Sequence, residues 1–166
     1  MDSILKERFK EIQERILSEI KLFYGERLIS VVIFGSSARE TQRFDSDIDI
    51  LIIVKDLPKG RMKRIREFEA VEDSVEPFLT LLQKEEINTY ISAVIKTPEE
   101  ALTGSPLFLD MVEDAKILLD KDGFFSHMLK RLRDTLKDLG AKRIWKGNAW
   151  YWDLKPDYKP GEVFEL

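Results

Sequence analysis

One segment of the chain combines residue types that bind phosphate and divalent metal ions. Gly35 and Ser36 follow an apolar run, and after ten further residues a second apolar run begins with Asp47-Ile48-Asp49. A glycine lets the backbone approach a phosphate closely, a serine offers its hydroxyl, and the free amides of the following turn attract an anion. Gly35 and Ser36 are therefore predicted to bind the phosphates of a nucleotide.

The two aspartates are spaced so that both carboxylates lie on one side of the expected strand. Side chains alternate across a strand, so Asp47 and Asp49 point to the same face. Two such carboxylates repel each other unless a cation lies between them, and Mg²⁺ accepts one or two carboxylates together with water and substrate phosphates. We therefore expect Asp47 and Asp49 to be the metal-binding and catalytic residues, holding Mg²⁺ against a nucleoside triphosphate. Arg39 and Arg43 lie in the connection, where they either neutralise phosphate charge as nucleotide-binding residues or face solvent.

Two other interpretations of the acidic pattern Asp45-x-Asp47-x-Asp49 explain it less well. A calcium-binding loop of the EF-hand type needs a glycine at its sixth position, where this chain has Ile50 inside an apolar run. A solvated turn accounts for Asp45, but an acid between two isoleucines inside a strand is costly without a partner. The pattern thus favours the Mg²⁺ site.

The same residues carry a resemblance to a known family. Gly35-Ser36, ten residues and then Asp47-x-Asp49 resemble the signature of the DNA polymerase β-like nucleotidyltransferase superfamily. More narrowly, the chain is similar to the minimal nucleotidyltransferases (MNT) of archaea and bacteria, over about residues 28–120. The resemblance implies an α/β (α+β) nucleotidyltransferase fold, with a small mixed β-sheet of about three to four strands flanked by helices.

The family resemblance also implies a reaction. A nucleoside triphosphate binds with Mg²⁺ at the two aspartates, a hydroxyl attacks the α-phosphorus, and pyrophosphate leaves. In the MNT–HEPN toxin–antitoxin systems the acceptor is a tyrosine of the HEPN-domain toxin, and the transfer of AMP from ATP silences it. We therefore expect an adenylyltransferase that acts as an antitoxin on a HEPN-domain partner.

One departure from the family pattern leaves other functions open. The superfamily usually has a third carboxylate on the next strand, but the run from Thr89 to Lys96 contains no acid, and Glu86 is the best substitute nearby. A nucleotidyltransferase-fold module that neutralises its partner by docking alone would need no such acid. A transferase for a small-molecule acceptor usually carries an additional helical domain, for which this chain has few residues to spare.

Apolar periodicity predicts the elements that must position these residues. Continuous β-branched runs predict buried strands, and apolar residues three and four apart predict amphipathic helices. Thr97-Pro98 followed by two glutamates predicts a helix start, and Pro77 predicts a kink or restart. The expected helices cover 3–24, 38–42, 61–73, 106–114 and 123–138, and the expected strands cover 28–34, 47–54, 89–96 and, at a sheet edge, 116–120.

A change in composition divides the chain into a nucleotidyltransferase domain over 1–144 and an aromatic C-terminal tail over 145–166. The tail contains three tryptophans, whose large aromatic side chains we expect to be covered. It is expected to pack on the protein's own core or a homodimer mate, to bind a different protein, or to stack a nucleobase. The sequence thus leaves a homo-oligomer open.

Composition excludes several other classes of function. The 166 residues include no cysteine and one histidine, which excludes disulfides, thiol catalysis and multi-histidine metal sites. The net charge of −4 gives no broad nucleic-acid-binding footprint. No apolar run is long enough to cross a membrane, and the charged N-terminus is no signal peptide, so a cytoplasmic protein is expected.

Overall fold

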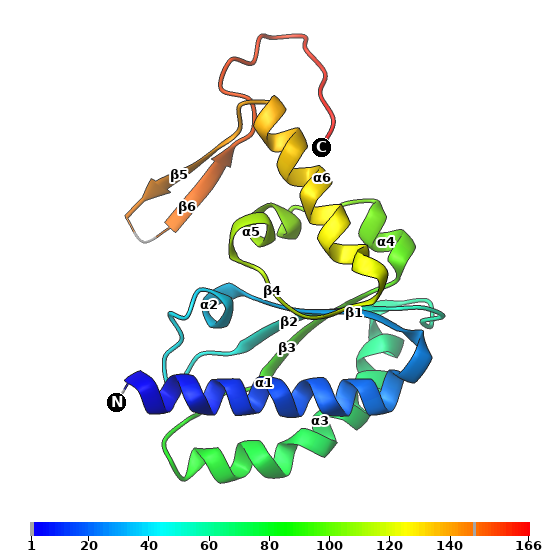
Figure 1. Ribbon diagram of the computed structural model, residues 1–166, viewed down its shortest axis with the longest axis vertical. Helices are drawn as coiled ribbons and strands as arrows, with labels where there is room; N and C mark the ends of the chain where they lie inside the picture. Colours follow the sequence, from blue (N-terminus) through cyan, green and yellow to red (C-terminus); the bar gives the residue numbers. More distant parts are fainter. Residues whose placement is uncertain (1, 148) are drawn as a thin grey trace.

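The fold is built on a mixed β-sheet with helices on both faces (Figure 1). The computed structural model describes residues 2–147 and 149–166. The sheet contains β1 (Leu28–Phe34), β2 (Ile48–Val54), β3 (Ile91–Lys96) and β4 (Lys116–Asp120), in the order β3-β2-β1-β4. The helices are α1 (Asp2–Tyr24), α2 (Gly35–Ala38), α3 (Arg61–Gln83), α4 (Pro98–Leu102), α5 (Leu107–Asp114) and α6 (Phe124–Asp138), with short 3₁₀ turns at Gly25–Arg27 and Lys121–Gly123.

The strand pairing explains why the sheet is mixed. Strand β1 is antiparallel to both β2 and β4, whereas β2 and β3 are parallel because α3 forms a crossover between them. This arrangement confirms the expected α/β fold and places 116–120 at a sheet edge as predicted. The register sets Phe34 opposite Asp49 in one direction and Ser92 beside Asp49 in the other.

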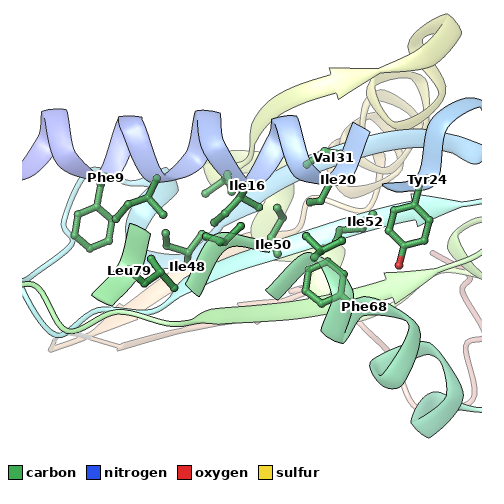
Figure 2. Packing of buried hydrophobic residues seen from close by; sticks show 14 of the residues in the cluster. Phe9, Ile16, Ile20, Tyr24, Val31, Ile48, Ile50, Ile52, Phe68 and Leu79 are labelled. Atoms are coloured by element: carbon green, nitrogen blue, oxygen red, sulfur yellow. The ribbon is translucent and has the colours of Figure 1, made fainter. Parts of the chain in front are cut away.

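The two central strands are buried because helices cover both faces of the sheet. On one face α1 and α3 pack against β2 in a cluster that includes Phe9 of α1, Ile50 of β2 and Phe68 of α3 (Figure 2). On the other face Leu51 and Ile53 belong to a second core with α4, α5 and α6. Alternation along β2 places Asp49 on that second face, where the apolar core ends.

The short helix and helix α3 differ from the expected elements, and β2 and β3 begin at Ile48 and Ile91, after the expected residues 47 and 89. The short helix begins at Gly35 instead of Ala38, since the Arg39 amide donates to the Gly35 carbonyl at 3.3 Å. It ends before the expected residue 42, because Glu40 adopts a left-handed φ of 55°. Helix α3 continues through Pro77 to Gln83, because buried apolar side chains on both sides of the proline pack on the same core.

The aromatic tail begins with a β-hairpin that the sequence did not predict. Strands β5 (Lys142–Lys146) and β6 (Ala149–Asp153) pair antiparallel, so the boundary expected at 145 falls inside β5. In Figure 1 the hairpin projects from the end of α6, above α2. Trp152 and Leu154 pack against the second core, so this part of the tail folds back on its own domain.

The predicted helix start at Thr97 is confirmed in detail. The Thr97 side chain caps α4 by accepting the Glu100 amide at 3.2 Å, and the Glu100 carboxylate accepts the Thr97 amide at 3.0 Å. Within the described part of the chain, no helix has both the length and the apolar character that crossing a membrane requires.

Candidate active site

Gly35 and Asp49 come together where β1 ends and β2 begins. A Cβ atom added at Gly35 would overlap the Asp49 carboxylate, lying 3.2 Å from its Cγ and closer still to Oδ2. Gly35 also has a φ of +69°, which side chains disfavour. Only glycine therefore allows the turn into α2 to lie directly against this carboxylate; the close approach to a phosphate stays a prediction.

The two aspartates form an interacting pair of carboxylates. Asp47 and Asp49 are both partly exposed, with Asp49 inside β2 and Asp47 just before it. Burial raises the pKa of Asp49, a hydrogen bond from Ser92 lowers it, and the negative charge of Asp47 raises it further. A cation between the carboxylates would relieve this repulsion.

Ser92 of β3 and Tyr90, just before this strand, place hydroxyl groups beside the two aspartates. Ser92 is the register partner of Asp49, and the exposed Tyr90 hydrogen-bonds Asp47, which raises the pKa of the Tyr90 phenol. Within residues 2–147 and 149–166, no three His, Cys, Asp or Glu side chains are grouped so as to hold a metal ion. On the next strand, the register partner of Asp49 is thus a serine and not an acid.

Glu86, the suggested substitute for the third carboxylate, lies elsewhere. It occupies the turn after α3 with a φ of 63°, and it lines a surface cavity together with Asn88 and Arg43. Because this turn precedes the part of β3 that pairs with β2, Glu86 does not join Asp47 and Asp49.

The two arginines of the connection separate in the structure. Arg39 lies close enough to Asp49 for its positive charge to lower the pKa of that carboxyl. Arg43 is 82% exposed, and its charged partner is Asp45 at 3.7 Å. Arg39 therefore lies near Asp49, whereas Arg43 lies on the surface loop, where no described contact links Arg43 to either Asp47 or Asp49.

Ser36 and the first turn of α2 complete the predicted phosphate-binding region. Ser36 is partly exposed beside Gly35, and no side chain caps α2 at Phe34. The first amides of a helix lack partners within the helix, so they are available to an anion. This turn and the aspartates border the same end of β1 and β2.

The donor set matches Mg²⁺ in kind. The two carboxylates are hard oxygen ligands, and their mutual repulsion is the electrostatic condition that a divalent cation satisfies. Two protein carboxylates leave most coordination positions for water and phosphate oxygens, as Mg²⁺ bound with a nucleotide requires. The cavities of about 640 and 540 Å³ do not include these aspartates, since the first is lined by residues of the C-terminal tail and the second lies along β3.

Comparison with known families agrees with this geometry. The family model described as "Nucleotidyltransferase domain" matches residues 7–103, which is more than half of the chain and includes Gly35, Ser36, Asp47, Asp49 and Ser92. The chain belongs to this nucleotidyltransferase family. The recognition made from the Gly-Ser and Asp-x-Asp motif is thereby confirmed, and the enzyme class with it.

Individual relatives are consistent with the family. A Methanocaldococcus jannaschii protein named "Putative protein adenylyltransferase" is 32% identical over 141 residues, covering 84% of this chain and 90% of the relative. The solved spectinomycin adenyltransferase of Enterococcus faecialis has the same fold, with 14% identity, a TM-score of 0.52, and coverage of 78% of this chain and 66% of its own. A toxin–antitoxin structure with AMP-PNP gives 16% identity and a TM-score of 0.42, with coverage of 76% and 97%.

Sequence reasoning missed several residues around the nucleotidyltransferase site. Tyr90, just before β3, and Ser92 on β3 are spaced two residues apart, as Asp47 and Asp49 are at the start of β2, and this parity was a usable signal. Which residue of β3 lies beside Asp49 depends on the register, which the sequence does not display. No comparable signal pointed to Trp150, which lies over Arg39.

Proposed function

We propose that this nucleotidyltransferase transfers AMP from ATP to a tyrosine hydroxyl of a HEPN-domain toxin and thereby acts as an antitoxin. The observation that carries the proposal is the interacting carboxylate pair Asp47 and Asp49, of which Asp49 lies against Gly35 and feels the charge of Arg39. The name of the 32% identical relative supports a protein as the acceptor. The HEPN partner follows from the motif's resemblance to the minimal nucleotidyltransferases.

Each residue has a role in binding and orienting the triphosphate. Gly35 keeps the backbone clear for phosphate oxygens, Ser36 donates its hydroxyl, and Arg39 neutralises phosphate charge. Asp47 and Asp49 would hold Mg²⁺, which when bound withdraws charge from the phosphates during transfer. Arg43 contributes at most from the surface loop, given its exposure and its ion pair with Asp45.

The transfer itself exchanges one bond at phosphorus. The acceptor oxygen forms a bond to the α-phosphorus, the bond from that phosphorus to the bridging oxygen of the β-phosphate breaks, and pyrophosphate leaves with the electron pair. The acceptor's proton passes to a base or to solvent. Here the base is weakened, because Ser92 stands on β3 in place of an acid.

The missing third carboxylate bears on the choice of acceptor. A tyrosine hydroxyl ionises with a pKa near ~10, far more readily than the aliphatic hydroxyl of a sugar or a serine. An acceptor that ionises readily needs less help from a general base. Ser92 therefore favours a tyrosine over an aliphatic alcohol as the substrate of this site.

A labelled-ATP transfer assay tests the proposal, with a HEPN-domain protein encoded beside the gene as acceptor. We expect Mg²⁺-dependent label on that protein with the wild type and with Asp45→Asn, and none with Asp47→Asn. Asp45 is the matched control because it is an exposed acid of the same loop that pairs with Arg43. Label that persists with Asp47→Asn would overturn the assignment.

Among the residues that the structure describes, no third acid joins Asp47 and Asp49, and this also supports a second function, a docking module without transfer. In that case the wild type would form a stable complex with the toxin and transfer no label. The Asp47→Asn protein would then protect cells from the toxin as well as the wild type does. Gel filtration of the mixture and a growth assay with both proteins separate the two functions.

A further inference from the structure

The β5–β6 hairpin makes direct contact with the nucleotide-binding arginine of α2. The guanidinium carbon of Arg39 lies 4.9 Å from the centroid of the Trp150 ring. Arg143 lies over the same ring at 5.3 Å and over Trp145 at 5.2 Å. Such distances are those of cation–π contacts, in which the electron-rich face of the ring attracts the cation. The hairpin is thus linked to the proposed phosphate site by its central tryptophan.

Helix α5 fixes the hairpin in this place. Asp110 accepts hydrogen bonds from the indole N–H groups of Trp150 at 2.6 Å and Trp152 at 3.0 Å. Asp114, at the end of the same helix, pairs with Arg143 at 2.6 Å. Both side chains of that pair are less than one-fifth exposed, which favours a defined geometry over a mobile surface ion pair.

Asp114 also extends toward Arg39, with 4.0 Å between its Oδ2 and Nη1 of Arg39. Arg39 is therefore held between Trp150 on the hairpin and Asp114 on α5, and its side chain is only 26% exposed. An arginine held in this way loses little further side-chain freedom when it binds a phosphate. Arg39 directly follows α2, whose first residue Gly35 lies against Asp49, and the charge of Arg39 acts on that carboxylate.

We infer that the hairpin is part of the nucleotide site, in which Trp150 and Asp114 are positioning residues that hold Arg39 toward the triphosphate. The inference rests on the proposed function, because it takes Arg39 to contact the phosphates. It gives the aromatic tail a role within its own domain. We do not expect a nucleobase to stack on Trp150, because Arg39 and Arg143 already lie over its ring.

A double-mutant cycle measures whether Trp150 acts through Arg39. Binding of ATP with Mg²⁺ is measured by calorimetry for the wild type, Trp150→Leu, Arg39→Gln and the double variant. We expect Trp150→Leu to weaken binding about five- to tenfold in the wild type, as the loss of a partly buried cation–π contact predicts. In the Arg39→Gln background the same substitution should have no effect.

Two comparisons separate positioning from other roles of the hairpin. Trp150→Leu should weaken inorganic tripolyphosphate as much as ATP, because Arg39 contacts phosphate and not the base. Tyr151→Leu is the matched control, since Tyr151 is a neighbouring, 54% exposed aromatic of the same strand, and it should leave both affinities unchanged. Trp150→Phe keeps an aromatic face and should restore most of the affinity. Unfolding curves verify that each variant is folded.

Three results would overturn the proposed role of Trp150. A loss of ATP affinity without a loss of tripolyphosphate affinity would show base stacking and overturn it, as would an equal loss in the Arg39→Gln background. An unchanged affinity in Trp150→Leu would also overturn it. If the wild type binds ATP with Mg²⁺ and Asp47→Asn does not, these failures concern the hairpin alone. If the wild type itself binds no nucleotide, the proposed function fails.

Discussion

Asp49 and Ser92 lie side by side on the parallel strands β2 and β3, so the group beside this carboxylate on the next strand is a hydroxyl and not an acid. The hydroxyl hydrogen-bonds the carboxylate and lowers its pKa, in opposition to burial, which raises it. Ser92 thus supports Asp49 in its charged form but cannot take a proton as a carboxylate does. The proposed metal-binding pair therefore has a hydroxyl, and not a general base, beside it on β3.

Restoring an acid at this position should widen the range of acceptors. We expect Ser92→Asp to raise the rate of transfer to an aliphatic hydroxyl, tested with a partner in which the acceptor tyrosine is replaced by serine. The gain should be about tenfold or more, the lower end of what a positioned general base contributes. Steady-state transfer of labelled AMP measures it, and Ser92→Asn is the size-matched control. Equal rates for the Asp and Asn variants would contradict the expectation.

Gly35→Ala should abolish nucleotide binding and destabilise the fold. The added Cβ would displace the Asp49 carboxylate, and the left-handed φ of +69° adds strain of about 1–2 kcal/mol for any side chain. Gly25→Ala is the matched control, because Gly25 has a similar φ of +53° and open space around it. Urea unfolding should show a loss of stability in both variants, whereas calorimetry should show lost binding in Gly35→Ala alone. Intact binding in Gly35→Ala would contradict the close approach.

Removal of Mg²⁺ should weaken ATP binding at least about tenfold in the wild type, because the triphosphate then faces two uncompensated carboxylates. Asp49→Asn removes one of these charges. It should therefore bind metal-free ATP better than the wild type does, and gain less when Mg²⁺ is added. Titrations with and without a chelator measure both effects, and Asp45→Asn should behave as the wild type. The same response to Mg²⁺ in Asp49→Asn and the wild type would argue against a metal site.

The ion pair between Arg64 and Glu100 should make stability depend on pH in acid. Two hydrogen bonds from the Arg64 guanidinium, at 2.6 and 2.8 Å, and one from the Thr97 amide lower the pKa of Glu100 to about 2. The folded value lies below the ordinary value of 4.5, so this stabilisation is present above pH 4.5 and is lost as the pH falls toward 2. The Glu100 side chain is 43% exposed, so solvent screening reduces the effect.

Urea unfolding of the wild type and Glu100→Gln measures this dependence. The stability difference between them should be larger at pH 6 than at pH 3. Arg64→Met removes the partner of the carboxylate and should flatten the same part of the wild-type profile. A difference that does not change between the two pH values would show that Glu100 acts through shape and not through charge.

Local chemistry allowed much of the fold and the centre of the site to be predicted from sequence. Strand β1 has the predicted bounds because its apolar β-branched run reports burial directly, and the partly exposed edge strand β4 also has the predicted bounds. The helix start at Thr97 was predictable because its capping residues are adjacent in the chain. Where long-range packing competes with a local rule, prediction failed, as in α3, which continues through Pro77.

The sequence alone was enough to recognise a nucleotidyltransferase, because Gly35, Ser36, Asp47 and Asp49 belong to one short segment whose spacing is local. The tertiary structure decided which residues surround them. It set Ser92 beside Asp49 through the register of two parallel strands, and it brought Trp150 over Arg39 across most of the chain. Register and docking depend on the simultaneous packing of distant elements, which no local pattern of residues records.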